Sequence, residues 1–261
     1  MNIEGSVVVI TGGGSGIGAA LARRFTADGA AAVIVVDRNG AAAQAVADEI
    51  GGTSVECDVT DPVAVAALVE QTIDAHGRID LFCSNAGITT GVELDDPEDL
   101  WHKAFEVNLM AHVYAARAVV PHMVARGSGY LLNTASAAGL LTSPGDAPYA
   151  VTKHGAVAFG EWLAVTYGDQ GIGVSVLCPM GVATPLLMDP LAAGEPGAQA
   201  VAASGEILDA DFVAGVVAAG LAEGTFLILP HPQVGTFWAQ KASNPDRWLA
   251  GMRRLISPLK H

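Results

Sequence analysis

Positively charged residues are scarce in this sequence. The 261 residues include 13 lysines and arginines against 27 aspartates and glutamates, which gives a formal net charge of −14. Nucleic-acid binding depends on a basic surface that displaces the counterions of the phosphates, and anionic membranes attract basic segments in the same way. The longest basic runs are the pairs Arg23-Arg24 and Arg253-Arg254. We therefore expect no nucleic-acid partner and no binding to an anionic membrane.

Cysteine is also rare. Cys57, Cys83 and Cys178 lie at or near the ends of hydrophobic runs, and no two of them have C-x-x-C spacing. An odd number of isolated cysteines is typical of buried thiols in a reducing compartment. No cysteines and histidines have the spacing of metal ligands. We expect no metal site and a cytoplasmic location.

Long hydrophobic runs are absent as well. No uninterrupted apolar segment approaches the roughly 18 residues that a membrane-spanning helix needs. The segment from Met1 to Gly5 contains no basic residue, and the short apolar run after it leads directly into a glycine-rich turn. This arrangement is unlike a secretory signal, so we expect a soluble protein without a membrane partner.

Hydrophobic residues make up 51% of the chain and charged residues 15%, which is typical of a globule with a large core. Short apolar runs alternate with longer segments of helical periodicity. This alternation predicts parallel strands covered by helices on both faces, a doubly wound α/β sheet of about seven strands. The expected strands are Val7–Thr11, Ala32–Asp37, Ser54–Asp58, Ile79–Ser84, Tyr130–Thr134, Val174–Cys178 and Phe226–Leu229.

Helices are expected between these strands. Asp61-Pro62 and Asp96-Pro97 each open one, with aspartate as the N-cap and proline in the first turn. The other expected helices are Gly16–Gly29, Gly40–Ile50 and about Pro148–Gln170, and the helix from Asp96 runs to about Arg126.

No linker divides the chain, so we expect a single domain over residues 1–261. The segment from about 185 to 206 is rich in alanine, glycine and proline and has little periodicity, which predicts a lid over a substrate. The residues from about 231 to 261 form a C-terminal tail. Trp238, Trp248, Arg253 and Arg254 give this tail an amphipathic pattern, and we expect it to cover the active site of its own subunit or of a neighbour.

The turn after the first expected strand is rich in glycine and leads directly into a helix, from Thr11 to Gly18. Backbone amides at a helix N-terminus, together with the helix dipole, hold a pyrophosphate. Glycines let the phosphates approach the backbone closely. The strand–turn–helix setting predicts a Rossmann-type dinucleotide site, with cofactor contacts from Gly12, Ser15, Gly16, Ile17 and Gly18.

Asp37 ends the second expected strand, nineteen residues after Gly18. An acid at this place accepts hydrogen bonds from the adenosine ribose hydroxyls and repels a 2′-phosphate. Arg38 follows directly and is able to accommodate that phosphate. The glycine turn carries Ser15 where a basic residue would favour NADP, so we expect NAD, with NADP as the alternative. A helix N-cap is the other interpretation of Asp37.

A third group of polar residues follows the fifth expected strand. Ser136 closes this strand, and Tyr149 and Lys153 lie four residues apart at the start of a helix, on one face of it. A free tyrosine titrates near ~10, too high for an efficient base at neutral pH. A nearby ammonium lowers that pKa, and a serine hydroxyl donates a hydrogen bond to a substrate oxygen. The set predicts proton transfer coupled to hydride transfer, although each residue alone would also suit a structural role.

These motifs occur in an order and spacing that resemble the short-chain dehydrogenase/reductase family, of the compact type called classical. The likeness extends over nearly the whole chain. It rests on the glycine turn from Thr11 to Gly18, Asp58-Val59, Asn85-Ala86-Gly87, Asn108, Ser136, Tyr149-x-x-x-Lys153 and Cys178-Pro179 with Thr184.

The resemblance implies a role for each matching residue. Ser136, Tyr149 and Lys153 would be catalytic, Tyr149 and Lys153 would also contact the nicotinamide ribose, and Asn108 would help hold a water in a proton relay. Further cofactor contacts would come from Asp58, Val59, Asn85, Ala86, Gly87, Pro179, Gly181, Val182 and Thr184. The family usually has Pro-Gly after the sixth strand. Here Met180 separates Pro179 from Gly181, which directs Met180 toward the substrate.

We expect an apolar substrate pocket built from Ser136, Leu140, Tyr149, Met180, Leu186 and Leu187. No cluster of basic residues offers itself for a substrate carboxylate or phosphate. Asp146 lies near the expected mouth, where a cap or loop role suits it better than a substrate contact. By resemblance, the alanine- and glycine-rich helices that carry Asn108 and Tyr149 would form a dimer, usually within a tetramer, a dimer of dimers.

The function expected from these observations is the NAD-dependent interconversion of a small hydrophobic secondary alcohol and its ketone, with Tyr149 as the general acid and base. Three alternatives stay open. One is a catalytically weak, nucleotide-sensing Rossmann protein, against which the complete set of Ser136, Tyr149 and Lys153 argues. Another is an NADP-dependent carbonyl reductase, which Arg38 would suit. The third is a different enzyme class on the same scaffold, a dehalogenase or an epimerase, against which the intact glycine turn and the compact length argue.

Overall fold

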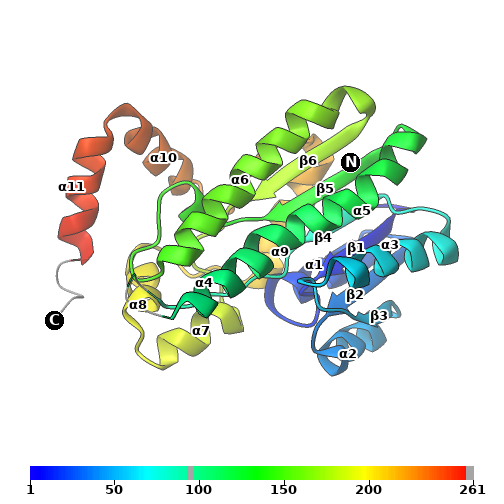
Figure 1. Cartoon of the computed structure of the whole chain (residues 1–261), viewed down its shortest axis with the longest axis horizontal. Coiled ribbons are helices and arrows are strands. Elements are labelled where there is room, and N and C mark those ends of the chain that lie inside the picture. Colours follow the sequence, from blue (N-terminus) through cyan, green and yellow to red (C-terminus); the bar gives the residue numbers. More distant parts are fainter. Residues whose placement is uncertain (93, 95–96, 257–261) are drawn as a thin grey trace.

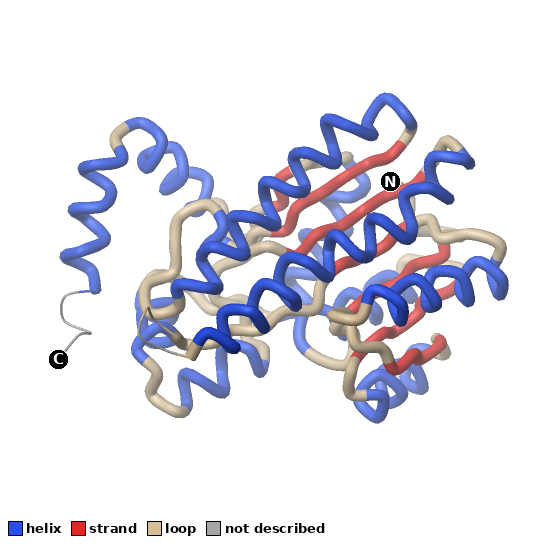
Figure 2. Tube along the Cα trace, in the orientation of Figure 1, coloured by secondary structure: helices blue, strands red, loops and turns tan. Residues whose placement is uncertain are grey.

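The protein is described from a computed structural model, which covers residues 1–92, 94 and 97–256. Its centre is one sheet of seven strands in the order β3-β2-β1-β4-β5-β6-β7, and every neighbouring pair is parallel. Figure 1 shows helices on both sides of this sheet, and Figure 2 shows the same layers by secondary structure. The expected doubly wound α/β fold is confirmed.

The strands are β1 (Val7–Thr11), β2 (Ala32–Asp37), β3 (Thr53–Glu56), β4 (Leu81–Ser84), β5 (Gly129–Thr134), β6 (Ile172–Leu177) and β7 (Leu227–Ile228). The helices are α1 (Gly16–Ala27), α2 (Gly40–Ile50), α3 (Pro62–His76), α4 (Glu98–Phe105), α5 (Ala111–Arg126), α6 (Ala147–Tyr167), α7 (Pro185–Ala192), α8 (Pro196–Ala203), α9 (Ala210–Glu223), α10 (Gln233–Ser243) and α11 (Pro245–Ile256).

The side chains of β1 alternate between two hydrophobic layers, because successive residues of a strand point to opposite faces of the sheet. Val8 and Ile10 pack with α1, α2 and α9, whereas Val7 and Val9 pack with α3, α5 and part of α6. All five residues of β1 are buried. A strand that is buried on both faces gives an uninterrupted apolar run, and this is the pattern from which the sheet was predicted.

Several segments differ from the sequence-based expectation. Helix α9 was not expected, because its residues are apolar on nearly all sides and give little amphipathic contrast. The long helix expected from residue 96 to Arg126 is divided by a π-helical turn, Glu106–Met110. Asp96, its expected N-cap, lies outside the described residues. The lid contains α7 and α8, and the tail contains α10 and α11. None of the described helices is long and apolar enough to cross a membrane.

The glycine turn between β1 and α1 is held in very close contact with its neighbours. Gly12 has a φ of +64°, a conformation that glycine adopts without a steric penalty. A Cβ added to Gly18 would lie 2.1 Å from the Gly12 carbonyl oxygen and 2.8 Å from Nδ2 of Asn85. The turn therefore folds back on the start of its own helix and leaves no room for a side chain at Gly18.

This packing predicts that Gly18→Ala destabilises the protein by about 1–3 kcal/mol, as overpacking of a tight backbone contact does. Thermal or urea unfolding measures the change. Gly168→Ala is the matched control, because a Cβ at Gly168 meets nothing within 4 Å and its φ is −55°. Equal stability of the two variants would contradict the proposed tight contact.

His112 is a polar side chain in the layer between α5 and the sheet. Only 2% of the residue is exposed, and within the described part of the chain neither ring nitrogen has a hydrogen-bond partner. Burial, reinforced by the positive charge of Lys153, lowers the pKa of His112 to about 3. Between the ordinary pKa of histidine and about 3, the ring is therefore neutral in the folded state although the unfolded chain would protonate it.

The lowered pKa of His112 predicts that acid weakens the fold. Between the unfolded value near ~6.5 and about 3, the unfolded state binds one more proton at this residue, so its share of the unfolding free energy falls by up to about 1.4 kcal/mol per pH unit as the pH drops. Denaturant unfolding across this range measures the slope. His112→Gln should flatten it, whereas His76→Gln, at an exposed position, should leave the slope unchanged. If the unfolding free energy of His112→Gln depends on pH as steeply as that of the unaltered protein, His112 is not the group that weakens the fold in acid.

Candidate active site

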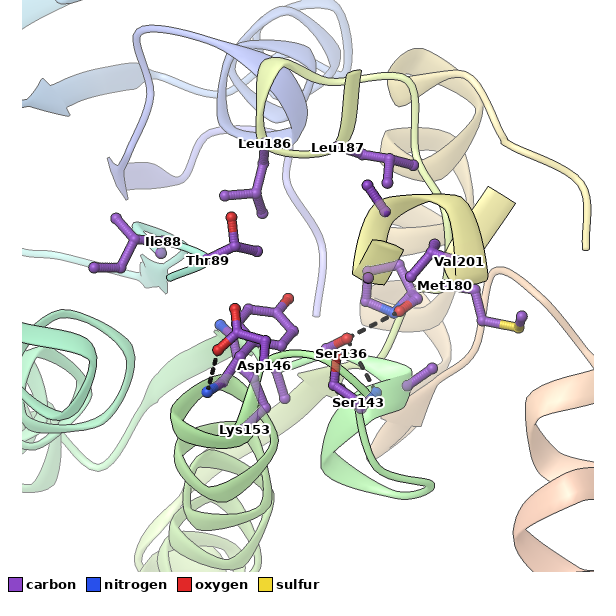
Figure 3. A pocket seen from close by; sticks show the side chains of 18 of the residues that line it. Ile88, Thr89, Ser136, Ser143, Asp146, Lys153, Met180, Leu186, Leu187 and Val201 are labelled. Atoms are coloured by element: carbon purple, nitrogen blue, oxygen red, sulfur yellow. Dashed lines mark hydrogen bonds between the residues drawn. The ribbon is translucent and has the colours of Figure 1, made fainter. Parts of the chain in front are cut away.

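A cavity of about 2070 Å³ lies along the carboxyl ends of β1 to β6. This is the edge at which open α/β sheets bind ligands. A pocket for one small molecule measures roughly 300–1000 Å³, so the cavity has room for a dinucleotide together with a substrate. Figure 3 shows part of it, with Ser136, Asp146 and Lys153 on one side and Leu186, Leu187 and Val201 on the other.

The first turn of α1 suits the pyrophosphate of a dinucleotide. Ser15 is the N-cap of this helix, but its side chain caps no backbone amide. Within the described residues, no hydrogen bond is found for the backbone amides of Gly16, Ile17 and Gly18, and Gly16 and Ile17 lie on the cavity wall. Unpartnered amides at a helix N-terminus form an anion site. These residues therefore fit a nicotinamide dinucleotide.

The end of the cavity that follows β2 and β3 is lined by acids and one arginine. Asp37 accepts hydrogen bonds from the backbone amides of Gly14 (3.1 Å) and Asn39 (2.9 Å). It therefore fixes the glycine turn, while Asn39 is the residue that caps α2. Asp58 accepts hydrogen bonds from the backbone amide and hydroxyl of Thr60, which lower its pKa. Arg38 and Val59 lie on the same wall.

Ser136, Tyr149 and Lys153 are brought together at the centre of the cavity. The Lys153 ammonium donates a hydrogen bond to the Thr134 carbonyl (2.9 Å) and lies 5.7 Å from the centre of the Tyr149 ring. The Ser136 hydroxyl oxygen accepts a hydrogen bond from the Ala138 amide (3.1 Å) and lies 3.5 Å from the Pro179 carbonyl. The three side chains thus converge from the end of β5 and the start of α6.

The pKa of Tyr149 is raised to about 12, mainly because burial disfavours the phenolate, while the hydrogen bond with Ser136 acts in the opposite direction. Burial also lowers the pKa of Lys153 to about 8. The net pKa of Tyr149 is thus higher than that of a free tyrosine and not lower as expected, because loss of water around the phenol dominates. The Lys153 ammonium donates its hydrogen bond to the Thr134 carbonyl and is not among the groups that shift this pKa.

Asn108 is fully buried in the π-helical turn before α5, beneath the cavity wall. Its side-chain oxygen accepts a hydrogen bond from the Ile88 amide (2.8 Å), and its side-chain nitrogen donates to the Ile88 carbonyl (2.9 Å). A Cβ added to Gly87 would lie 3.3 Å from Nζ of Lys153 and 3.4 Å from Oδ1 of Asn108. Asn108 thus holds the segment from Asn85 to Ile88 against Lys153.

Asp146 has the cap role that was expected for it. It is the N-cap of α6 and accepts a hydrogen bond from the Tyr149 amide (3.0 Å). It also accepts hydrogen bonds from the Thr90 amide (2.8 Å), the Thr90 hydroxyl (2.8 Å) and the Gly91 amide (3.0 Å). One carboxylate therefore joins the helix of Tyr149 to the loop after β4.

Most of the expected site residues line this one cavity. They are Gly12, Ser15, Gly16, Ile17, Asp37, Arg38, Asp58, Val59, Asn85, Ala86, Gly87, Ser136, Tyr149, Lys153, Pro179, Met180, Val182, Thr184, Leu186 and Leu187. Gly18 lies behind the glycine turn, and Gly181 packs near Leu187, Val201 and Ile207.

The prediction that Leu140 lines the substrate pocket is wrong. Its side chain packs in a core cluster with Val157 and Val234 and does not line the cavity. Its neighbour Leu141 is on the wall. The short helical turn Ala137–Gly139 precedes these two residues, and adjacent residues at the end of such a turn point in different directions.

Other cavity residues were missed in the sequence. Ile88 and Thr90 come from the loop after β4, Val201 from α8 and Arg247 from α11, where Trp248 and Arg254 of the expected tail also line the cavity. The loop residues are fixed by hydrogen bonds to Asn108 and Asp146, which are distant in sequence, so no local pattern marks them. For α11, the sequence predicted an amphipathic cover over an active site and left open which subunit it would cover; in this structure α11 lines the cavity of its own chain.

Comparison with known proteins agrees with this geometry. A family model described as short chain dehydrogenase matches residues 6–193. The 1-deoxy-11-beta-hydroxypentalenate dehydrogenase of Streptomyces exfoliatus is 38% identical over 196 residues, which cover 72% of this chain and 71% of that protein. The D-beta-hydroxybutyrate dehydrogenase of Rhizobium meliloti is 34% identical over 190 residues, which cover 69% of this chain and 72% of that protein.

A solved structure extends the likeness to nearly the whole fold. The crystal structure of a short chain dehydrogenase/reductase from Burkholderia phymatum in complex with NAD has a TM-score of 0.86 and 28% sequence identity, with coverage of 94% of this chain and 96% of that chain. The family match, the shared sheet and the shared order of motifs lead to one conclusion. The chain belongs to the short-chain dehydrogenase/reductase family.

Proposed function

We propose that this protein is an NAD-dependent oxidoreductase that interconverts a hydrophobic secondary alcohol and its ketone. The family and its dehydrogenase members establish the oxidoreductase class. The observation that carries the proposal is the convergence of Ser136, Tyr149 and Lys153 on a cavity whose other end is built for a dinucleotide.

Bound NAD would supply the hydride acceptor, next to Thr184 and the segment from Pro179 to Val182. Tyr149 exchanges the proton of the alcohol oxygen, accepting it during oxidation and returning it during reduction. Its raised pKa keeps the phenol protonated at neutral pH, which suits donation to a ketone oxygen. The Ser136 hydroxyl donates a hydrogen bond to the same oxygen and stabilises the charge that develops there.

Lys153 and Asn108 support Tyr149 and Ser136 by positioning the cofactor and the segment next to it. The Lys153 ammonium lies beside Gly87, where the nicotinamide ribose would pass. Asn108 fixes the adjacent segment through Ile88. The family's water relay would start from this pair.

The choice of NAD rests on Asp37. Its carboxylate ends β2 on the cavity wall, where it would accept hydrogen bonds from ribose hydroxyls and repel a 2′-phosphate. The Burkholderia phymatum neighbour is in complex with NAD. Arg38 lies on the same wall and is the observation that favours the alternative, an NADP-dependent carbonyl reductase.

The apolar pocket, the assembly and the compartment complete the proposal. Leu141, Met180, Leu186 and Leu187 line the substrate end of the cavity.

Trp162 and Val165 leave an exposed apolar surface on α6, which supports a homo-oligomer, a dimer of dimers in the form expected from the family. The three cysteines are free and buried, which suits the cytoplasm.

The proton-transfer role predicts that Tyr149→Phe lowers kcat by about 10²- to 10⁴-fold, because general acid–base catalysis contributes on that scale. Absorbance of NADH with a panel of secondary alcohols and ketones measures turnover. Fluorescence titration should find NADH affinity nearly unchanged in Tyr149→Phe and weakened in Lys153→Ala. Tyr167→Phe, at the far end of α6, is the control.

Retention of most of the activity in Tyr149→Phe would refute the assignment of Tyr149. Tight binding of NAD by the unaltered protein, without turnover of any alcohol or ketone, would instead favour the nucleotide-sensing alternative.

The cofactor assignment predicts a higher kcat/KM with NAD than with NADP. Asp37→Ser should narrow this preference by about tenfold or more, because it removes a charge worth roughly 1.4 kcal/mol of repulsion toward a 2′-phosphate. Asp48→Asn, an exposed aspartate on α2, is the matched loss of charge and should leave the preference unchanged. A higher kcat/KM with NADP for the unaltered protein would establish the alternative reductase.

A further inference from the structure

Helix α11 contributes to the wall of the same cavity as Ser136 and Tyr149. Figure 1 shows it beyond α10 and α8, at the end of the molecule that carries the C-terminus. Phe237 of α10 and Trp248 of α11 pack together with ring centres 6.2 Å apart, and both belong to one hydrophobic cluster with Leu141. This contact attaches α11 to the loop after Ser136. The residues that α11 contributes to the cavity wall are Arg247, Trp248, Gly251, Met252 and Arg254.

Arg247, Gly251 and Arg254 are spaced four and then three residues apart, so they share one face of the helix. Gly251 leaves the middle of this face without a side chain. A Cβ added there would lie 4.0 Å from a guanidinium nitrogen of Arg254, which shows that this guanidinium lies over the bare backbone. Arg247 and Arg254 thus lie on either side of Gly251 on the helix face that lines the cavity.

Neither arginine is neutralised by the protein. In the part of the chain that the structure describes, no ion pair includes Arg247 or Arg254. Arg38, Lys103, Arg117 and Arg253 likewise take part in no ion pair among the described residues. Arg247 and Arg254, both exposed, differ from these in lining the cavity together from one helix face. Two uncompensated positive charges on one cavity wall suit an anionic ligand.

The carboxylates on the cavity wall either accept hydrogen bonds within the protein or lie in parts of the cavity formed by other elements than α11. Asp146 accepts hydrogen bonds from Thr90, Gly91 and Tyr149. Asp37 and Asp58 lie at the adenosine end, and Glu195 lies on the lid beside Gly91. The apolar residues of the cavity wall include Leu141, Met180, Leu187, Val201, Trp248 and Met252, and polar residues from the same segments, Thr142, Ser143, Gln240, Ser243 and Asn244, line it as well.

We propose that the substrate is an apolar hydroxy acid, or the corresponding oxo acid, whose carboxylate binds between Arg247 and Arg254 while its carbinol or ketone carbon lies at Ser136 and Tyr149. This inference rests on the proposed function and deepens it. Guanidinium groups bind carboxylates through paired, charge-assisted hydrogen bonds. The apolar body of the substrate crosses the hydrophobic part of the cavity. Helix α11 thereby selects substrates by charge at the end remote from the reaction.

The test compares acids with their uncharged methyl esters. A ladder of (ω−1)-hydroxy fatty acids from hexanoate to tetradecanoate covers different lengths, and lithocholate adds a rigid polycyclic body. With NAD and the full chain, we expect kcat/KM to be at least about tenfold higher for the preferred acid than for its ester, mainly through a lower KM. Equal use of acid and ester would overturn the proposal.

Variants assign the effect to the two arginines. Arg247→Gln and Arg254→Gln should each raise KM for the acid by about tenfold with kcat nearly unchanged, and leave KM for the ester unaltered. The corresponding lysine variants should recover part of the loss. Arg253→Gln is the matched control, because Arg253 is exposed and does not line the cavity. An equal effect of all three glutamine variants, or equal effects on acid and ester, would refute the assignment.

A binding measurement separates this inference from the proposed reaction. Calorimetric titration of the NADH-bound protein with laurate, dodecanol and dodecyl phosphate requires no turnover. Laurate should bind at least about tenfold more tightly than dodecanol, and Arg254→Gln should remove the difference. If no alcohol is oxidised and laurate still binds in this way, the proposed reaction fails and the carboxylate site stands. Binding of dodecyl phosphate without binding of laurate would show that the site takes a phosphate and would overturn the proposal.

Discussion

The hydrogen bond from the buried Lys153 ammonium to the Thr134 carbonyl joins the two halves of the active site. Thr134 is the last residue of β5 and Lys153 lies on α6, so this contact fixes the helix that carries Tyr149 against the carboxyl edge of the sheet. An ammonium buried without a partner would be strongly unfavourable. The bond therefore holds the lysine in place, and burial, not the charge of Lys153, dominates the pKa of Tyr149.

Two further polar contacts extend this arrangement to the loop after β4. Asn108 binds the amide and carbonyl of Ile88, and Asp146 binds Thr90 and Gly91. Both side chains are buried, where a satisfied hydrogen bond is worth keeping because its loss leaves an unpaired polar group. The loop after β4 is thus fixed by the same elements that hold Tyr149 and Lys153. In the proposed function, cofactor placement and proton transfer would share this one frame.

The outer wall of the cavity is built differently. It consists of the short helices α7 and α8 of the lid and of α10 and α11 of the tail, with Trp248 and Phe237 as the apolar contact to the loop after Ser136. Because these helices lie outside the sheet, substitutions in them can alter which ligands the wall accepts without disturbing the sheet edge. This division agrees with the general rule that one fold supports different functions through the residues placed at its site.

The sequence by itself determined the sheet, the glycine turn and the spacing of Tyr149 and Lys153, because each depends on short-range rules: strand alternation, helix capping and the four-residue repeat of a helix. Only the tertiary structure decided that Leu141 and not Leu140 faces the cavity, that Asn108 supports Ile88, and that burial raises the pKa of Tyr149. It also decided that Arg247 and Arg254 meet the same cavity as Ser136. These facts depend on contacts between residues far apart in the chain and on how completely water is excluded, and neither leaves a local pattern in the sequence.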